Sequence, residues 1–208
     1  MRSLAVSIAI LAGGASKRFG SDKAFAKFRG MPLIKHLVWR FRKHTDDLFV
    51  VSRFDEPDRL QSVDVPIIYD SHSDRTIMGA VIDSIEASKN DRTLVIAVDF
   101  PLINWSILNW ISKSLAANED ALFGVPKLRN GYQPLCALYR KECLQILKQR
   151  LSNNQQRMQD VCDERDCLSL EVPEQFQWQF LNMNTAEDLM IAEQLAEKHQ
   201  IQFIESDD

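Results

Sequence analysis

A glycine-rich loop near the start of the chain has the composition of a phosphate-binding site. The loop reads Leu11-Ala12-Gly13-Gly14-Ala15-Ser16-Lys17-Arg18-Phe19-Gly20-Ser21-Asp22-Lys23. Its three glycines let the backbone approach a phosphate closely and turn N–H groups toward it. Arg18 and Lys23 supply positive charge for phosphate oxygens, which arginine can bind bidentately. We therefore expect this loop to hold phosphate groups.

Spacing separates this loop from two common phosphate-binding motifs. The chain has no Gly-x-Gly-x-x-Gly, so it lacks the dinucleotide fingerprint, and no Gly-Lys-Ser/Thr, so it lacks a Walker loop. A purely structural turn explains one or two glycines, but it does not explain three glycines followed by Asp22-Lys23.

The charge of the chain is unevenly distributed. The 208 residues carry a net charge of −4, which argues against a general nucleic-acid binder. Nine of the 25 basic residues nevertheless lie between Lys17 and Lys43, with Asp22 as the single acid among them. Such a concentration of positive charge on an acidic chain indicates a local anion-binding site. The alternative interpretation is that these residues form the solvated face of a helix. We expect Arg40, Arg42 and Lys43, at its far end, to lie on the solvated surface.

Two acids follow apolar runs that have the composition of strands. Asp99 ends the run Thr93–Val98, and Asp70 ends another. A carboxylate at the carboxyl edge of a sheet can hold Mg²⁺, which takes oxygen ligands and usually one or two protein carboxylates. We favour a metal-binding role for Asp99 over a helix N-cap. For Asp70 the alternative to a ligand contact is an Asx-turn.

Apolar runs alternate with helical patterns along the chain. This alternation predicts a three-layer α/β/α fold with a mostly parallel, Rossmann-like sheet. Ligands bind at the carboxyl ends of such strands, where the loop and both acids would lie. We expect strands over Leu4–Leu11, Leu48–Ser52, Pro66–Tyr69, Thr93–Val98, Ala121–Val125 and Pro134–Leu138. We expect helices opening at Pro32, near Gly79, over Trp105–Leu115, over Lys141–Leu151 and from Thr185 to about Lys198.

We expect one domain over residues 1–200 and a frayed tail over 201–208. The content of 45% hydrophobic and 26% charged residues is ordinary for a soluble globular protein. Leu4–Ala12 imitates a short signal peptide, but its β-branched residues favour a buried strand. The four cysteines form no Cys-x-x-Cys pair, so we expect reduced, structural thiols in a cytoplasmic protein. No apolar run is long enough to span a membrane.

The first loop and several later segments resemble the molybdenum cofactor guanylyltransferases (MobA family). The resemblance starts with the loop and continues through Phe28-Arg29-Gly30-Met31-Pro32-Leu33-Ile34-Lys35-His36. Further matches are Asp70, Asp99-Phe100-Pro101, Gln133-Pro134-Leu135 and Asn182-Met183-Asn184-Thr185-Ala186-Glu187-Asp188-Leu189. The last of these makes the resemblance specific, and together they cover nearly the whole chain.

The resemblance implies a fold of the nucleotide-diphospho-sugar transferase type and a Mg²⁺-dependent transfer of GMP from GTP. The acceptor would be a molybdopterin-type cofactor, the products its guanine dinucleotide form and pyrophosphate, and the protein partners delivery proteins or apo-molybdoenzymes. By this resemblance the catalytic residues are Arg18, Lys23 and Asp99, with Asp99 on the metal. The implied binding residues are Leu11, Ala12, Gly13, Gly14, Lys23, Ser52, Asp70, Asp99, Gly79, Arg157, Asn182 and Asn184. Among them Asp70 faces guanine, and Asn182, Asn184 and Arg157 face the pterin.

Two departures from the family pattern keep other functions open. The family's Gly-Pro-Leu-x-Gly segment is reduced to Gly79 after Arg75-Thr76-Ile77-Met78, and Ser52 stands where relatives carry a base-contacting asparagine. One alternative is a transferase that uses CTP or another phosphate acceptor. Another is a non-catalytic protein that binds and carries the cofactor. For Asn182 and Asn184 the alternative is a turn, and for Arg157 an exposed charge.

Overall fold

The computed structural model describes residues 5–13, 22–53, 60–71, 76–163 and 165–201 of the chain. Its strands are β1 (Ser7–Leu11), β2 (Lys27–Phe28), β3 (Met31–Pro32), β4 (Leu48–Ser52), β5 (Ile67–Tyr69), β6 (Arg92–Ala97), β7 (Phe123–Leu128), β8 (Gly131–Tyr132), β9 (Cys136–Arg140) and β10 (Cys167–Glu171). Its α-helices are α1 (Leu33–Phe41), α2 (Ile77–Ala87), α3 (Trp105–Ala116), α4 (Leu144–Ser152), α5 (Met158–Val161) and α6 (Ala186–Lys198). Short 3₁₀ helices are η1 (Lys23–Phe25), η2 (Lys141–Cys143) and η3 (Glu174–Phe180).

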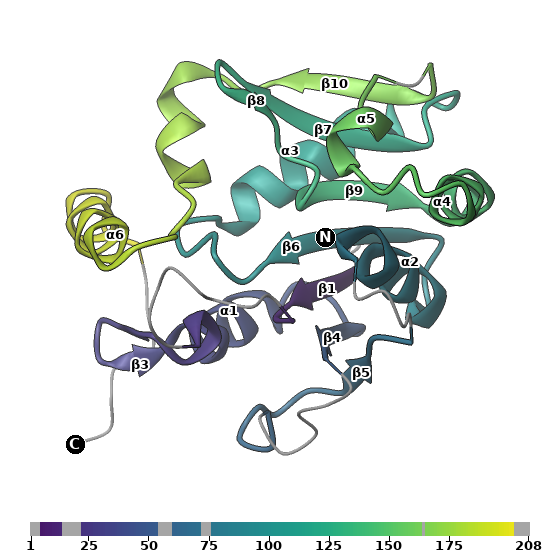
Figure 1. Cartoon of the computed structure of the whole chain (residues 1–208). Coiled ribbons are helices and arrows are strands. Elements are labelled where there is room, and N and C mark those ends of the chain that lie inside the picture. Colours follow the sequence, from purple (N-terminus) through teal and green to yellow (C-terminus); the bar gives the residue numbers. More distant parts are fainter. Residues whose placement is uncertain (1–4, 14–21, 54–59, 72–75, 164, 202–208) are drawn as a thin grey trace.

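Eight strands form the central sheet, and β2 and β3 form a separate hairpin. The order across the sheet is β10-β7-β9-β6-β1-β4-β5, with β8 paired to β7. Figure 1 shows this sheet from β10 at the top to β5 at the bottom. The pairs β1–β4, β1–β6, β4–β5 and β10–β7 are parallel, whereas β9 runs antiparallel to both β6 and β7. The predicted mostly parallel sheet is therefore confirmed.

Helices cover both faces of this sheet and make it the middle of three layers. On one face α1, α3 and α6 form a core in which Leu37 and Ile111 pack with Ile10 of β1. On the other face α2, α4 and α5 form a second core that includes Ile82 and Val95 of β6. Successive strand residues point to opposite faces, so a strand buried on both sides is apolar at almost every position. This explains why the central strands were recognisable as continuous apolar runs.

The expected strands correspond to β1, β4, β5, β6, β7 and β9, and the expected helices to α1, α2, α3, α4 and α6, with shifts at several boundaries. The strand at Leu48–Ser52 has the expected bounds, whereas the strand expected at Pro134–Leu138 lies two residues later and runs antiparallel. The apolar pattern did not predict the short elements β2, β3, β8 and α5, nor β10, a partly exposed edge strand with no continuous apolar run. No helix in the described part of the chain is long and apolar enough to cross a membrane.

The helix starts follow ordinary capping chemistry. The helix expected near Gly79 begins at Ile77, because the Thr76 side chain accepts a hydrogen bond from the Gly79 amide at 3.0 Å. The capping box expected at Thr185 and Asp188 is present at the start of α6. Each cap fixes the point where a loop from the sheet edge turns into a helix.

The prediction that Arg40, near the end of the basic segment, lies on the solvated surface is wrong. Its side chain is buried, and its Nη1 donates to the carbonyl oxygens of Pro101 and Ile103 at 2.7 and 2.8 Å. Burial lowers the pKa of Arg40 to about 10, so the guanidinium remains charged at neutral pH. Arg40 therefore ties α1 to the loop that follows β6, whereas Arg42 is exposed and contacts Asp64 at 3.3 Å.

We predict that Arg40→Met lowers the free energy of unfolding by about 2 kcal/mol, because two carbonyl oxygens lose their donor. Arg42→Met, in the same segment, is the matched control and should change stability by no more than about 0.5 kcal/mol. Urea denaturation of both variants measures the difference. Equal, small losses in the two variants would contradict a structural role for Arg40.

Candidate functional site

A cavity of about 490 Å³ lies where the parallel strands β1, β4, β5 and β6 end. Its walls come from the segments after these strands, from η1, and from the first turn of α2. The lining residues are Leu11, Ala12, Gly13, Asp22, Lys23, Ala24, Val51, Ser52, Arg53, Asp70, Thr76, Ile77, Ala80, Ala97, Val98, Asp99 and Leu135. The carboxyl edge of a parallel sheet is the usual place for ligands in this class of fold.

Strand register brings these segments together. Leu11, the last residue of β1, lies between Val51 of β4 and Ala97 of β6. The ladder continues past the strands, because the Val98 amide donates to the Leu11 carbonyl oxygen at 2.9 Å. On the other side the Asp70 amide donates to the Ser52 carbonyl oxygen at 2.8 Å. The main chains that carry the polar groups are therefore fixed by the sheet itself.

Gly13 packs closely against the next loop of the sheet edge. A Cβ atom at this position would lie 3.3 Å from Cγ of Arg53 and 3.7 Å from the Arg53 backbone nitrogen. A side chain at this position would require the Arg53 side chain to shift by a few tenths of an ångström. Glycine here keeps the first loop against the end of β4 and leaves its backbone open toward the cavity.

Lys23 lies at the centre of the polar groups. Asp22 caps η1 by accepting a hydrogen bond from the Ala24 amide at 3.0 Å, and this turn projects Lys23 over the ends of the strands. Nζ of Lys23 donates to Oδ1 of Asn184 at 2.7 Å and lies 3.5 Å from Oδ2 of Asp99. One ammonium group thus joins segments from the beginning, the middle and the end of the chain.

Asp99 is a largely buried carboxylate directly beyond β6. Its side chain is 20% exposed, and burial raises its pKa, although Lys23 and a hydrogen bond from Asn182 act in the opposite direction. Its Oδ1 is buried and makes no hydrogen bond within the described residues. The helix-cap alternative for this acid does not hold, because Asn104 caps α3 by accepting from the Ile107 amide.

The segment before α6 is held against Asp99 by its backbone. The Met183 amide donates to the Asp99 carbonyl oxygen at 2.8 Å, and the Met183 side chain is fully buried. The amide of Asn184 donates to Asp188 of the capping box, also at 2.8 Å. These bonds direct Asn184 toward Lys23 and place Asn182 beside Asp99.

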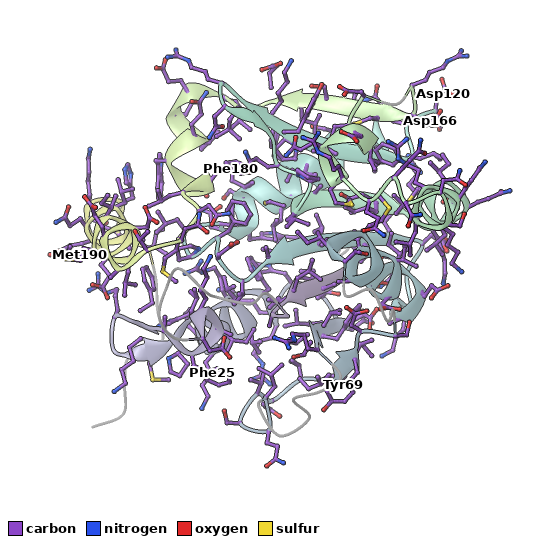
Figure 2. The ribbon with its side chains drawn as sticks, viewed as in Figure 1. Phe25, Tyr69, Asp120, Asp166, Phe180 and Met190 are labelled. Carbon is purple, nitrogen blue, oxygen red and sulfur yellow. The ribbon has the colours of Figure 1, made fainter. Side chains whose placement is uncertain are left out.

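A second cavity of about 480 Å³ includes Asn182 in its wall. Most of its polar lining residues carry side-chain amides, and one, Arg129, is a cation. The polar lining residues that the structure describes are Arg129, Asn130, Gln133, Gln177, Trp178 and Asn182. Figure 2 shows Phe180, which lines this second cavity, in the upper left, and Tyr69, which precedes Asp70 of the first cavity, near the bottom. Oδ1 of Asn182 is buried without a hydrogen-bond partner in the described part of the chain.

Most of the expected site residues that the structure describes lie together. The first cavity brings together Leu11, Ala12, Gly13, Lys23, Ser52, Asp70 and Asp99. Asn184 reaches this group through Lys23, and Asn182 through Asp99. Gly14 and Arg18 lie outside the described residues.

Two expected residues lie away from this group. Gly79 lies in the first turn of α2, where its amide donates a hydrogen bond to the Thr76 side chain. Its neighbours Thr76, Ile77 and Ala80 line the first cavity, whereas Gly79 is not among the described residues that do. Arg157 precedes α5 with an exposed side chain, and its Nε lies 3.9 Å from Oδ1 of Asp160. It lines neither of the two cavities described here.

Sequence reasoning missed Arg53 and the wall formed by α2. Arg53 directly follows the strand Leu48–Ser52, so the rule that ligands bind at strand ends could have identified it. Ile77 and Ala80 gave no such signal, because apolar residues in a helix indicate packing before they indicate ligand contact. Ile77 is nevertheless 54% exposed at the edge of the cavity.

Comparison with known proteins agrees with this geometry. Residues 8–168 match the family model of the MobA-like NTP transferase domain. A relative from Clostridium perfringens, named probable molybdenum cofactor guanylyltransferase, is 28% identical over 193 residues, which cover 88% of this chain and 93% of the relative. A relative of the same name from Thermococcus gammatolerans is 28% identical over 187 residues, which cover 87% of this chain and 95% of the relative.

Solved structures show the same fold. Molybdopterin-guanine dinucleotide biosynthesis protein A from Archaeoglobus fulgidus superposes with a TM-score of 0.79 at 20% identity, covering 92% of this chain and 99% of that one. The 2-C-methyl-D-erythritol 4-phosphate cytidylyltransferase from Thermus thermophilus gives 0.67 at 16% identity, covering 93% and 100%. The family match spans the site from the first loop to Asp99 and beyond. The chain belongs to the MobA-like NTP transferase family and is an enzyme of the nucleotidyltransferase type.

Proposed function

We propose that the protein transfers GMP from GTP to the terminal phosphate of a molybdopterin-type cofactor, releasing pyrophosphate. An oxygen of the acceptor phosphate forms a new bond to the α-phosphorus of GTP. The bond from that phosphorus to the bridging oxygen breaks, and pyrophosphate leaves with the electron pair. The names of the relatives support this choice of substrates.

One observation carries the proposal, namely the contacts that Lys23 makes with Asp99 and Asn184 at the wall of the first cavity. Lys23 lines the first cavity together with Gly13, and its ammonium group reaches both Asp99 and Asn184. A triphosphate bound along the first loop would place its reacting phosphorus near this ammonium group. The second cavity, which Asn182 lines, offers room for an acceptor.

The side chains at this position suit phosphoryl-group transfer. Attack by a phosphate anion needs no strong general base, so catalysis depends on positioning and on stabilisation of negative charge. Lys23 would stabilise charge on the α-phosphate and on the leaving pyrophosphate. From the sequence we assign Arg18 the same task.

The residues around Asp99 fit a magnesium ion. Its buried Oδ1 has no hydrogen-bond partner in the described part of the chain, and a carboxylate oxygen is a suitable ligand for Mg²⁺. Within the described residues no group of three or more His, Cys, Asp or Glu side chains gathers, so most ligands of the ion would have to come from substrate phosphates and water. When bound, Mg²⁺ supplies charge neutralisation at the phosphate oxygens. Asp99 is the residue that would hold it.

The acceptor would occupy the second cavity. Amide side chains such as Asn130, Gln133 and Gln177 offer both donors and acceptors, as a pterin ring requires, and Arg129 adds a cation. Asn182 lies between this cavity and Asp99, so it can position the acceptor phosphate. The expected delivery proteins or apo-molybdoenzymes remain predictions from the resemblance, and the cytoplasmic location remains a prediction from the cysteine pattern.

Base selection keeps a second candidate function open. Asp70 lines the first cavity, and its carboxylate can accept hydrogen bonds from guanine N–H groups. Ser52, fully buried at the cavity wall, is smaller than the asparagine expected from the resemblance and favours a transferase with a different base preference. We therefore keep a CTP-dependent transferase as the second candidate.

Calorimetry of GTP, CTP and ATP with and without Mg²⁺ distinguishes the candidates. The proposal predicts binding that needs Mg²⁺ and prefers GTP. Preference for CTP would support the second candidate. Binding of the cofactor without pyrophosphate release would instead indicate a carrier.

We predict that Lys23→Ala lowers kcat/KM for pyrophosphate release by about 10² or more, which is the scale for removal of one preorganised donor. Lys27→Ala is the matched control, because Lys27 is an exposed lysine four residues further along the chain. The control should keep activity within about twofold. Near-normal activity of Lys23→Ala would overturn the role given to Lys23.

We predict that Asp99→Asn raises the melting temperature at pH 7.5 without ligand while it abolishes Mg²⁺-dependent activity. The pKa of Asp99 is raised in the folded state, so its ionised form costs stability above the ordinary value of 3.8, and the cost disappears as the pH falls. The gain should therefore shrink in scans at lower pH. About 2–4 °C corresponds to each 1 kcal/mol in a chain of this size. A variant less stable than wild type at pH 7.5 would contradict this electrostatic account.

A further inference from the structure

Asp83 is a buried carboxylate in α2 that holds the loop after β5. Its side chain is 6% exposed. Its Oδ2 accepts a hydrogen bond from the Ser71 amide at 2.9 Å, and its Oδ1 accepts one from the Ser71 hydroxyl at 2.6 Å. Two bonds from one carboxylate to one residue fix that residue in both position and orientation.

Ser71 directly follows Asp70, so this contact also fixes Asp70. The Asp70 amide already donates to the Ser52 carbonyl oxygen at 2.8 Å, which extends the β4–β5 pairing by one residue. The backbone is thus anchored by the sheet at Asp70 and by α2 at Ser71. Asp70, which lies between these two anchors in the chain, lines the cavity.

The same helix also lines this cavity. Thr76, Ile77 and Ala80 of the first turns of α2 line the cavity, and Asp83 lies one turn after Ala80. The hydrogen bonds of Asp83 therefore join the wall that carries Asp70 to the wall that carries Ile77.

Packing alone does not explain a carboxylate at this position. The neighbouring inward residues of α2 are Met78, Val81, Ile82 and Ile85, all fully buried and apolar. An apolar side chain at position 83 would avoid the cost of removing a charge from water. At this position the carboxylate makes the two hydrogen bonds that hold Ser71.

We propose that Asp83 is a positioning residue for nucleotide selection, acting through Ser71 to orient Asp70 and to set the width of the slot for the base. This inference rests on the proposed function, because it takes the first cavity as the nucleotide site. Asp83 touches no reacting atom in this account. Its removal should affect which nucleotide binds and how tightly, and should leave use of the acceptor unchanged.

The test measures Kd for the Mg²⁺ complexes of GTP, CTP and ATP by calorimetry in wild type and in Asp83→Ala. Loss of the anchor should weaken GTP binding by about 10-fold or more and reduce the preference for GTP over the other nucleotides. The KM for the cofactor acceptor should stay within about twofold. Asp83→Asn should restore most of the wild-type behaviour, since an amide can accept from the Ser71 amide and donate to its hydroxyl.

Ser84→Ala is the matched control in the same helix. Ser84 is fully buried, and its hydroxyl donates to the Ala80 carbonyl oxygen within α2 at 2.6 Å. Its loss should lower the melting temperature without changing nucleotide preference. If Asp83→Ala fails to fold, Ser71→Ala removes one of the two bonds from an exposed loop residue and should weaken GTP binding by about threefold.

The outcomes separate this inference from the proposed function. If wild type binds none of the three nucleotides, the proposed function fails. If wild type selects a nucleotide and Asp83→Ala or Ser71→Ala keeps both affinity and selectivity, only the inference about Asp83 fails. Equal changes in Asp83→Ala and Ser84→Ala would also overturn it, because they would show a general effect of destabilising α2.

Discussion

The site depends on keeping the Asp99 carboxylate in a largely dry position at the end of β6. Burial raises the pKa of this group, so the ionised form is held at a cost that Lys23 and Asn182 only partly offset. A carboxylate of this kind gains strongly from any further cation, because its buried Oδ1 has no hydrogen-bond partner in the described part of the chain. The polar arrangement is thus more favourable with charged ligands present than without them.

The scaffold holds this arrangement through backbone hydrogen bonds and through the side chain of Arg40. Leu11 and Val98 continue the sheet past its strands, and Met183 bonds to the carbonyl oxygen of Asp99. Arg40 holds the loop that follows Asp99 by donating hydrogen bonds to the carbonyl oxygens of Pro101 and Ile103 in that loop. Exposed features further away, such as Met190 of α6 at the left of Figure 2, take no part in these contacts. The chain near Asp99 is therefore held by three neighbours, namely Leu11 of β1, Met183 before α6 and Arg40 of α1.

Much of the fold and part of the site could be predicted from the sequence. Strands that are buried on both faces, such as β4, appear in the sequence as continuous apolar runs. The run that forms β6 also predicted that Asp99 lies at the carboxyl edge of the sheet. The edge strand β10 gave no comparable signal, because its exposed side chains carry no clear pattern. The burial of Arg40 could not be predicted either, since its partners are carbonyl oxygens 61 and 63 residues away in the sequence. The bond between Lys23 and Asn184 joins residues even further apart.

The most direct test of the account is the product of one turnover. Wild-type protein would be mixed with GTP, Mg²⁺ and a molybdopterin-type cofactor that carries a terminal phosphate. The account predicts one pyrophosphate for each dinucleotide that contains GMP, with both products identified by mass spectrometry and neither formed by Asp99→Ala. Dinucleotide formation by Asp99→Ala at the wild-type rate, or no GMP transfer by the wild type, would contradict it.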